Sequence, residues 1–402
     1  MSQALPRVAP RRPSPVEGPF DLWLTVALVA LVSLGLVMVA SASISIASRS
    51  QAHELYYFWR QLAAFGLGGL LGYWVFRQPL ERWQRLGVAG LLLGIAMLIA
   101  VLLPGVGHEV NGSMRWLNVG LFTVQASEPV KLAVIVYVAG YLVRHQAQVR
   151  RDFLGFAKPV LVMTVVAGLL LLEPDFGAAA VLFATTLGML FMGGVPILRF
   201  LSWGMAALVM LASLAMLAPY RMQRLLTFRN PWADPYDTGF QLTQALIAFG
   251  RGEWFGVGLG NSVQKLFYLP EVHTDFIFAV VGEELGLIGT VSTVCLFVFF
   301  VWRILHVGGR AEQAGMRFGA NLAYGIALLI GLEAFINIGV NMGILPTKGL
   351  TLPFISYGSN STVMLCCAMG LVFRVAYETN PPPRRPLAKP AEAAPPPEAV
   401  HV

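Results

Sequence analysis

Acidic residues gather at the start of one long apolar segment. Residues 268–290 read YLPEVHTDFIFAVVGEELGLIGT, a polar loop that becomes an apolar helix. The ionisable groups in this stretch are Glu271, His273, Asp275, Glu283 and Glu284. Only 12% of the whole chain is charged, so the stretch is unusually rich in acids. A carboxylate beside an imidazole can accept and return a proton, which is the chemistry of general acid–base catalysis.

Asp275 has two interpretations. It could begin a membrane helix and serve as a first-turn acid that matches the helix dipole. Alternatively it could be a general base at the outer membrane surface, positioned or tuned by Glu271 and His273. We expect Glu283 and Glu284, which lie deeper in the segment, to form a structural polar network.

A second set of groups opens another apolar segment, QASEPVKLAV. Ser127 is a good helix cap and Pro129 suits the first helical turn. Glu128 and Lys131 are three residues apart, so they share one helix face. They could form a surface ion pair, or Lys131 could contact an anionic ligand while Glu128 orients it.

Two further polar patterns lie in apolar surroundings. Asp175, in EPDFGAA, could cap a helix or line a cavity. Glu333, Asn337 and Asn341 recur every four residues, which places them on one face of a helix. We interpret this stripe as cavity lining or as helix-to-helix hydrogen bonding.

Long apolar segments must position all of these groups. The chain has 402 residues, 56% of them hydrophobic, which indicates an all-α, polytopic membrane protein. Ten transmembrane helices are predicted over residues 20–42, 56–76, 85–104, 127–143, 158–172, 175–193, 197–217, 275–303, 318–341 and 353–376. Residues 20–376 form one membrane domain, and the Pro- and Ala-rich tails, 1–19 and 377–402, are predicted to be disordered.

The distribution of Lys and Arg sets the orientation. Most of the 28 basic residues fall in segments that share a side with the N-terminus, so both termini are predicted to be cytoplasmic. A large loop, 218–274, then faces outward between the seventh and eighth helices. Its GFQLTQALIAFGRG pattern predicts a short interfacial helix. The net charge of +7 is spread over many short loops, which argues against a nucleic-acid partner.

A synthetic reaction at the outer face needs a substrate that carries its own activation. A lipid-linked diphosphate sugar meets this need and reaches the site through the membrane. Cations would hold the diphosphate, and one carboxylate, Asp275, would take the proton of the attacking hydroxyl in an inverting transfer. The outward-facing cations are Arg115, Lys131, Arg221, Arg224, Lys265 and Lys348.

Four motifs carry a family resemblance: NGSMRWLNVGLFTVQASEPVKL, EPDFG, the run from GFQLTQALIAFGRGEWFGVGLGN to HTDFIFAVVGEELG, and GILPTKGLTLPFISYGSNS. With these, residues 20–376 resemble the SEDS family of bacterial cell-wall polymerases, most closely its division branch rather than its elongation branch. The resemblance implies ten transmembrane helices and polymerisation of lipid II into peptidoglycan glycan strands at the septum. It implies a catalytic role for Asp275, and a cavity lined by Arg115, Glu128, Lys131 and Asp175.

The same resemblance implies partners and a cofactor. The partners are a class B penicillin-binding transpeptidase with one transmembrane helix, and regulators of cell division. Some members need a divalent cation, Mg or Mn, which could bind the substrate diphosphate and a single carboxylate. The chain departs from the family pattern at Ala126 and Ser359, and neither change removes an ionisable group. A lipid II flippase and a non-catalytic division scaffold remain alternatives.

Overall fold

The computed structural model describes residues 21–49, 55–110, 113–120, 122–216, 228–237, 239–265, 272–346 and 349–380. The helices are α1 (Leu22–Arg49), α2 (Tyr56–Arg77), α3 (Leu80–Leu102), α4 (Ser127–Arg144), α5 (Gln146–Arg151), α6 (Phe153–Leu172), α7 (Phe176–Met192), α8 (Ile197–Met216), α10 (Phe240–Gly252), α11 (Ile277–Gln313), α12 (Arg317–Asn341) and α13 (Ser359–Thr379). A 3-10 turn, η1 (Pro231–Ala233), precedes α10. The predicted disordered tail 1–19 and residues 381–402 lie outside the described residues, whereas residues 377–379, predicted as the start of the C-terminal tail, belong to α13.

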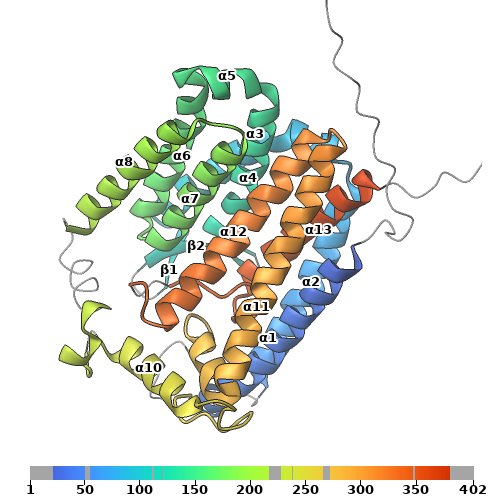
Figure 1. The fold of residues 1–402 in the computed structure, drawn as a ribbon. Helices are drawn as coiled ribbons and strands as arrows, with labels where there is room; N and C mark the ends of the chain where they lie inside the picture. Colours follow the sequence, from blue (N-terminus) through green and yellow to red (C-terminus); the bar gives the residue numbers. More distant parts are fainter. Residues whose placement is uncertain are drawn as a thin grey trace, which may run out of the picture.

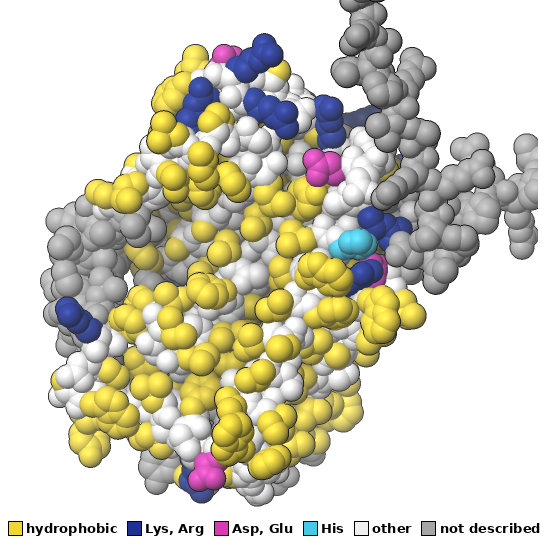
Figure 2. Space-filling view, in the orientation of Figure 1, with side chains coloured by type: hydrophobic (Ala, Val, Ile, Leu, Met, Phe, Trp, Pro, Cys, Tyr) yellow, Lys and Arg dark blue, Asp and Glu magenta, His cyan; other side chains and the backbone are white. Residues whose placement is uncertain are grey.

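The long helices run side by side, with α5 at one end of the molecule and α10 at the other (Figure 1). Among the described residues, six helices are long and apolar enough to cross a membrane: α1, α3, α6, α11, α12 and α13. Shorter apolar helices lie at Phe176–Met192 and Ile197–Ala206. Hydrophobic side chains cover the middle of the face in Figure 2, and Lys and Arg gather toward the α5 end. This is the surface of a multi-pass membrane protein.

A small antiparallel sheet departs from the predicted all-α fold. Strands β1 (Gly107–Val110), β2 (Ser113–Val119) and β3 (Phe122–Gln125) lie in the order β1-β2-β3. Val110 pairs with Ser113, and the two residues between them in sequence are Asn111 and Gly112, the dipeptide most typical of tight hairpins. The prediction missed the sheet because it searched this segment for charges and not for hairpin signals.

The predicted eighth span differs most from the structure. It was predicted over 275–303, but α11 begins at Ile277 and ends at Gln313. A straight helix of 37 residues would be about 55 Å long, far more than a bilayer core of about 30 Å. Gly286, with φ 67° and ψ −163°, breaks α11. The residues before the break form a half-helix, 277–285, that lies at the α10 end of the molecule (Figure 1).

Glycines let several elements approach one another closely. A Cβ on Gly72 of α2 would lie 2.6 Å from the Cys366 carbonyl oxygen of α13, so these helices pack backbone to backbone. Helix α13 starts at Ser359, later than the predicted 353, because residues 353–358 form turns. These turns pack on α1, where a Cβ on Gly35 would lie 2.2 Å from the Phe354 carbonyl oxygen.

Candidate functional site

The backbone around Asp275 is fixed by hydrogen bonds from two other parts of the chain. The carbonyl of His273 accepts from the Tyr357 N–H at 2.8 Å, and the carbonyl of Thr274 accepts from the Ser356 hydroxyl at 2.5 Å. The carbonyl of Asp275 accepts from two side-chain amides of α12, each at 2.9 Å. Three consecutive carbonyls are therefore held, which fixes the point from which the Asp275 carboxylate projects.

Asp275 does not cap a helix. Helix α11 begins at Ile277 after the N-cap residue Phe276, and its first turn contains no acid. The interpretation of Asp275 as a first-turn acid is therefore wrong. Its side chain is half-buried and lies beside Gly349, where an added Cβ would be 3.1 Å from the Asp275 Oδ2 atom. A half-buried carboxylate on a fixed backbone suits a general base.

His273 lies in a group of aromatic rings next to Asp275. Its ring centroid is 4.8 Å from that of Tyr57 and 5.4 Å from that of Tyr357. These rings belong to α2 and to the turns before α13, so His273 connects the Asp275 segment to both. Glu271, the other group expected to tune Asp275, lies outside the described residues.

Lys131 forms a buried cluster with two acids. Its Nζ atom is 2.9 Å from Glu128 Oε1 on α4 and 2.5 Å from Glu333 Oε1 on α12. All three residues are at most 9% exposed, so the predicted alternative of a surface ion pair is wrong. We call Glu128, Lys131 and Glu333 the Lys131 cluster. Ser127 does not cap α4 as predicted, because the N-cap is Ala126 and no side chain caps it.

Arg115 and Asp175 lie at the turn between α6 and α7. Asp175 is the N-cap of α7 and accepts from the Ala178 N–H at 3.1 Å, which confirms the capping interpretation. Arg115, on β2, donates to the Glu173 carbonyl at 3.1 Å and to the Pro174 carbonyl at 2.6 Å. The charge of Asp175 also acts on Glu333, so this turn adjoins the Lys131 cluster.

Glu173 is a buried acid that the sequence analysis did not single out. It is 1% exposed, and its carboxylate oxygens have no hydrogen-bond partner among the described residues. Burial raises the pKa of Glu173 to about 8; the nearby charge of Asp175 also raises it, and Arg115 lowers it. The side chain therefore holds a proton at neutral pH.

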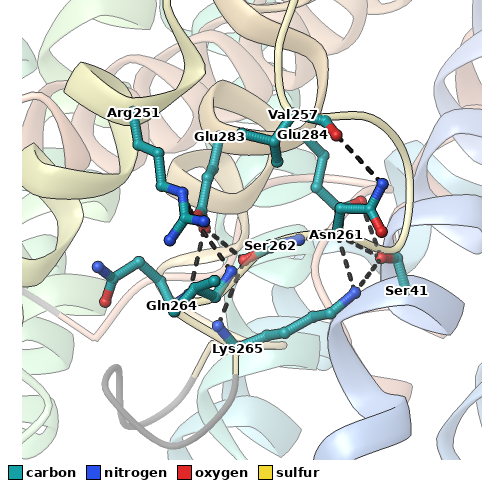
Figure 3. A network of polar contacts seen from close by, with 10 residues as sticks. Ser41, Arg251, Val257, Asn261, Ser262, Gln264, Lys265, Glu283 and Glu284 are labelled. Atoms are coloured by element: carbon teal, nitrogen blue, oxygen red, sulfur yellow. Dashed lines mark hydrogen bonds and ion pairs between the residues drawn. The ribbon is translucent and has the colours of Figure 1, made fainter.

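Lys265 lies in a second cluster. Its Nζ atom is 3.0 Å from Glu284 Oε1 and 3.1 Å from the Ser41 hydroxyl oxygen of α1 (Figure 3). The Ser41 hydroxyl in turn lies 2.6 Å from Glu284 Oε1. We call Ser41, Lys265 and Glu284 the Lys265 cluster. Lys265 is 6% exposed and paired with an acid; its role as a substrate-binding cation stays a prediction.

Glu283 anchors the loop that carries Lys265. Its carboxylate accepts from the Val263 N–H at 3.0 Å, from the Gln264 N–H at 3.3 Å and from the Ser262 hydroxyl. Arg251, at the end of α10, reaches the same carboxylate at 3.6 Å (Figure 3). These contacts confirm the prediction of a structural polar network for Glu283 and Glu284.

The glycine-rich segment before Lys265 has a structural role. The N–H groups of Val257 and Gly258 donate to the carbonyls of Glu283 and Glu284 at 3.0 and 3.1 Å. The Leu287 N–H, beyond the break at Gly286, donates to the Glu253 carbonyl at 2.8 Å. The loop thus supplies the hydrogen bonds that the broken helix lacks.

The predicted site residues therefore fall into separate groups. Glu128 and Lys131 are brought together, Arg115 and Asp175 adjoin them, and Asp275 lies with His273. Of the predicted cations, Arg221, Arg224 and Lys348 lie outside the described residues. Glu333 was not predicted as a partner of Lys131, although its place in the polar stripe was a signal. Among the described residues, no group of three or more His, Cys, Asp or Glu side chains could hold a metal ion.

Known proteins share both the sequence and the fold. Two relatives are each named "Probable peptidoglycan glycosyltransferase FtsW". The one from Nitrosococcus halophilus is 55% identical over 362 residues, covering 90% of this chain and 93% of that protein. The one from Coxiella burnetii is 50% identical over 375 residues, covering 92% of this chain and 100% of that protein.

Solved structures of similar proteins share the fold of this chain. A chain described as "Structural coordination of polymerization and crosslinking by a peptidoglycan synthase complex" has a TM-score of 0.74 and 27% identity, covering 90% of this chain and 99% of that chain. The rod shape determining protein RodA of Thermus thermophilus has a TM-score of 0.66 and 27% identity, covering 89% and 96%. Residues 22–381 match the FtsW/RodA/SpoVE profile, described as cell cycle protein. The chain belongs to the FtsW/RodA/SpoVE family.

Proposed function

We propose that this protein is a peptidoglycan glycosyltransferase that polymerises lipid II into glycan strands at the outer face of the cytoplasmic membrane. The observation that carries the proposal is its similarity to proteins named for this activity, 55% identical over 90% of the chain. The geometry supports it, because a carboxylate on a fixed backbone lies at the same end of the molecule as buried cations. The proposed general base is Asp275.

The proposed reaction is an inverting glycosyl transfer. The hydroxyl oxygen of one sugar forms a bond to the anomeric carbon of another. The bond from that carbon to the lipid diphosphate oxygen breaks, and the diphosphate leaves with the electron pair. Asp275 takes the proton of the attacking hydroxyl. The diphosphate is already a good leaving group, so the reaction needs no strong general acid.

Lys131 and Arg115 are the cations proposed to meet the diphosphate. Lys131 is bound by two acids, so the anion would compete with a carboxylate for it. Arg115 uses two of its N–H groups on backbone carbonyls and is half-buried. A divalent cation, Mg or Mn, would add charge neutralisation; it would bind the diphosphate and one carboxylate, as Mg²⁺ often does.

The proposed topology has ten transmembrane helices, cytoplasmic termini and an outer loop that includes α10. The opposite positions of α5 and α10 support it (Figure 1). Single cysteines replacing Ala147 and Asp234 test it by labelling from outside intact cells, after outer-membrane permeabilisation where needed. We expect labelling at position 234 only. Labelling at 147 but not at 234 would overturn the topology.

The proposed setting is the division septum, in complex with a class B penicillin-binding transpeptidase of the FtsI type. Regulators of the FtsQ, FtsL, FtsB and FtsN type would surround the pair. The similarity to proteins named FtsW supports this role over that of the elongation homologue RodA. We expect low activity from the isolated protein and a rise with its cognate transpeptidase. Equal turnover with and without that partner, at matched lipid II, would count against the complex.

A strand-forming assay separates this function from its alternatives. The purified protein, with its transpeptidase partner, is incubated with lipid II, and glycan strands are resolved by length. A polymerase makes strands, whereas a lipid II flippase or a division scaffold makes none. The absence of strands from well-folded complex would refute the proposal.

A further inference from the structure

A polar column runs along one face of α12 and joins the two groups proposed to act in the reaction. Glu333, Asn337 and Asn341 are spaced by four residues and are 3%, 1% and 0% exposed. In a helix, residues four apart lie about 6 Å apart along the axis, so the column is about 12 Å long. Every member makes a contact with another part of the chain.

One end of the column holds the Asp275 segment. The side-chain amides of Asn337 and Asn341 both donate to the Asp275 carbonyl at 2.9 Å. The Asn341 Oδ1 atom also accepts from the Ala279 N–H at 3.1 Å, in the first turn of α11. Asn337 donates as well to the carbonyl of Leu350, which follows Gly349 beside the Asp275 carboxylate. The two amides therefore fix the chain at Asp275, at Ala279 after it, and at Leu350 in the segment beside its carboxylate.

The other end holds Lys131. Glu333 lies 2.5 Å from the Lys131 Nζ atom, and Glu128 lies 2.9 Å from the same atom. One ammonium group faces two carboxylates, so the Lys131 cluster carries an excess of acid. An anion that approaches Lys131 meets this negative charge. Loss of the charge on Glu333 would therefore strengthen anion binding at Lys131.

We propose that the α12 column sets the separation between the diphosphate-binding lysine and the general base, with Asn337 and Asn341 as positioning residues for Asp275 and Glu333 as the positioning residue and counter-ion for Lys131. This inference rests on the proposed function. In that reaction the base and the diphosphate lie on opposite sides of one anomeric carbon. Misplacement of about 1 Å costs catalysis heavily, and a single helix face is more rigid than a loop.

Variants at the two ends of the column should have different kinetic effects. Asn341→Leu keeps the number of side-chain heavy atoms and removes every hydrogen bond of the Asn341 amide, to Asp275, Ala279 and Asn337. We therefore expect kcat for lipid II to fall roughly 10- to 100-fold while KM stays within about twofold. Glu333→Gln keeps a hydrogen-bond acceptor and removes the charge. We expect inorganic pyrophosphate to bind at least about fivefold more tightly to this variant than to wild type.

The experiment measures kcat and KM with lipid II, pyrophosphate affinity by calorimetry, and thermal melts, all on the full-length protein in complex with its transpeptidase. Glu284→Gln is the matched control, because it removes a buried charge that pairs with the other buried lysine. It should leave pyrophosphate affinity within about twofold of wild type. Should Asn341→Leu fail to fold, Asn341→Ser provides a smaller change at the same position.

The possible outcomes distinguish a failure of this inference from a failure of the proposed function. Equal changes in kcat and KM at both ends of the column, or unchanged pyrophosphate affinity in Glu333→Gln, would overturn the inference while wild type still makes strands. A wild-type protein that makes no strands would refute the proposed function. In that case, tighter pyrophosphate binding by Glu333→Gln alone would still support the role of Glu333.

Discussion

Among the described residues two lysines are buried, Lys131 and Lys265, and they differ in their surroundings. In the Lys265 cluster, Glu284 accepts from a lysine, a serine hydroxyl and the Ser262 N–H at 3.4 Å, and the adjacent Glu283 accepts from loop N–H groups. In the Lys131 cluster, two carboxylates share one ammonium. The first arrangement binds a loop to a broken helix. The second holds a cation with excess acid beside it.

On this difference we propose a structural role for Lys265 and a role in the reaction for Lys131. A carboxylate that also binds several backbone N–H groups anchors the loop that supplies them. The acids around Lys131 come from two helices, and one of those helices also holds the Asp275 backbone. We therefore assign the Lys131 cluster to the reaction and the Lys265 cluster to the fold, and each of the following predictions tests that assignment.

The largest effect is expected at Asp275, which the α12 column connects to the Lys131 cluster. Asp275→Asn keeps the size of the side chain and leaves the backbone carbonyl free to accept from α12, but it cannot take a proton at neutral pH. Activity should fall roughly 10²- to 10⁴-fold. The measurement is glycan-strand formation by purified complex beside a thermal melt. Wild-type strand formation by folded Asp275→Asn protein would remove Asp275 from the mechanism, and Glu271 would be tested next.

Matched double variants compare the two lysines directly. Lys131→Met with Glu333→Gln, and Lys265→Met with Glu284→Gln, each remove one positive and one negative charge. The first should lower activity about 100-fold or more, because a preorganised cation for the leaving diphosphate is lost. The second should lower the melting temperature more than the first, because a loop loses its anchor, with activity per folded molecule within about threefold.

The pairs are changed together because Lys131→Met alone would leave two buried acids, Glu128 and Glu333, without their cation, whereas the double variant leaves only Glu128. Such a loss is strongly destabilising, so the single variant would confuse stability with catalysis. Melting curves and strand assays of both double variants test which cluster acts in the reaction. If the Lys265 double loses activity and the Lys131 double loses only stability, the assignment of the two clusters is reversed.

The sequence predicted the local parts of these sites and missed the distant ones. The Asp175 cap and the Glu128–Lys131 pair involve residues three apart, so helix geometry alone indicates them. Lys131 and Glu333 are 202 residues apart, and Ser41 and Glu284 are 243 apart. No spacing rule connects such residues. The burial of the Glu128–Lys131 pair was not predicted for a related reason. The start of a helix looks solvent-exposed until the positions of the surrounding helices are known.

The break in α11 at Gly286 was also not predicted. An apolar run shows that a helix is present, but it does not show that the hydrogen bonds at Gly286 are made by a loop from another part of the chain. The structural role of the glycine-rich GVGLGN segment became clear only from its backbone hydrogen bonds with Glu283 and Glu284. The ten predicted spans still await the labelling experiment.

A moderate effect on stability is expected at Gly286, the break in α11 that is stabilised by the loop carrying Lys265. Gly286 has φ 67°, and an added Cβ would lie 2.3 Å from the Gly256 nitrogen. Gly286→Ala should therefore destabilise the fold by about 1–3 kcal/mol or more, from backbone strain and the clash. Gly90→Ala on α3 is the control, because no atom lies within 4 Å of its added Cβ. Equal melting temperatures for the two variants would show that the loop does not constrain the break.

The smallest effect concerns the pH dependence contributed by Glu173, the buried acid near the Lys131 cluster. Its pKa is raised to about 8 in the folded protein, first by burial and then by Asp175, against the lowering effect of Arg115. The pKa of a glutamate in the unfolded chain is about 4.3. Folding therefore favours the protonated form of Glu173. Its contribution to the free energy of unfolding is complete below about pH 4 and is lost as the pH rises through about 8.

The melting temperature should consequently fall between pH 6 and pH 9, and Glu173→Gln should flatten that fall by a few degrees, on the order of 2–4 °C. The amide cannot ionise, so the variant keeps the neutral state at every pH. Glu81→Gln, which removes an exposed acid on α3, should leave the wild-type slope. An unchanged slope in Glu173→Gln would mean that this carboxyl finds a partner in solution and does not contribute to the pH dependence of stability.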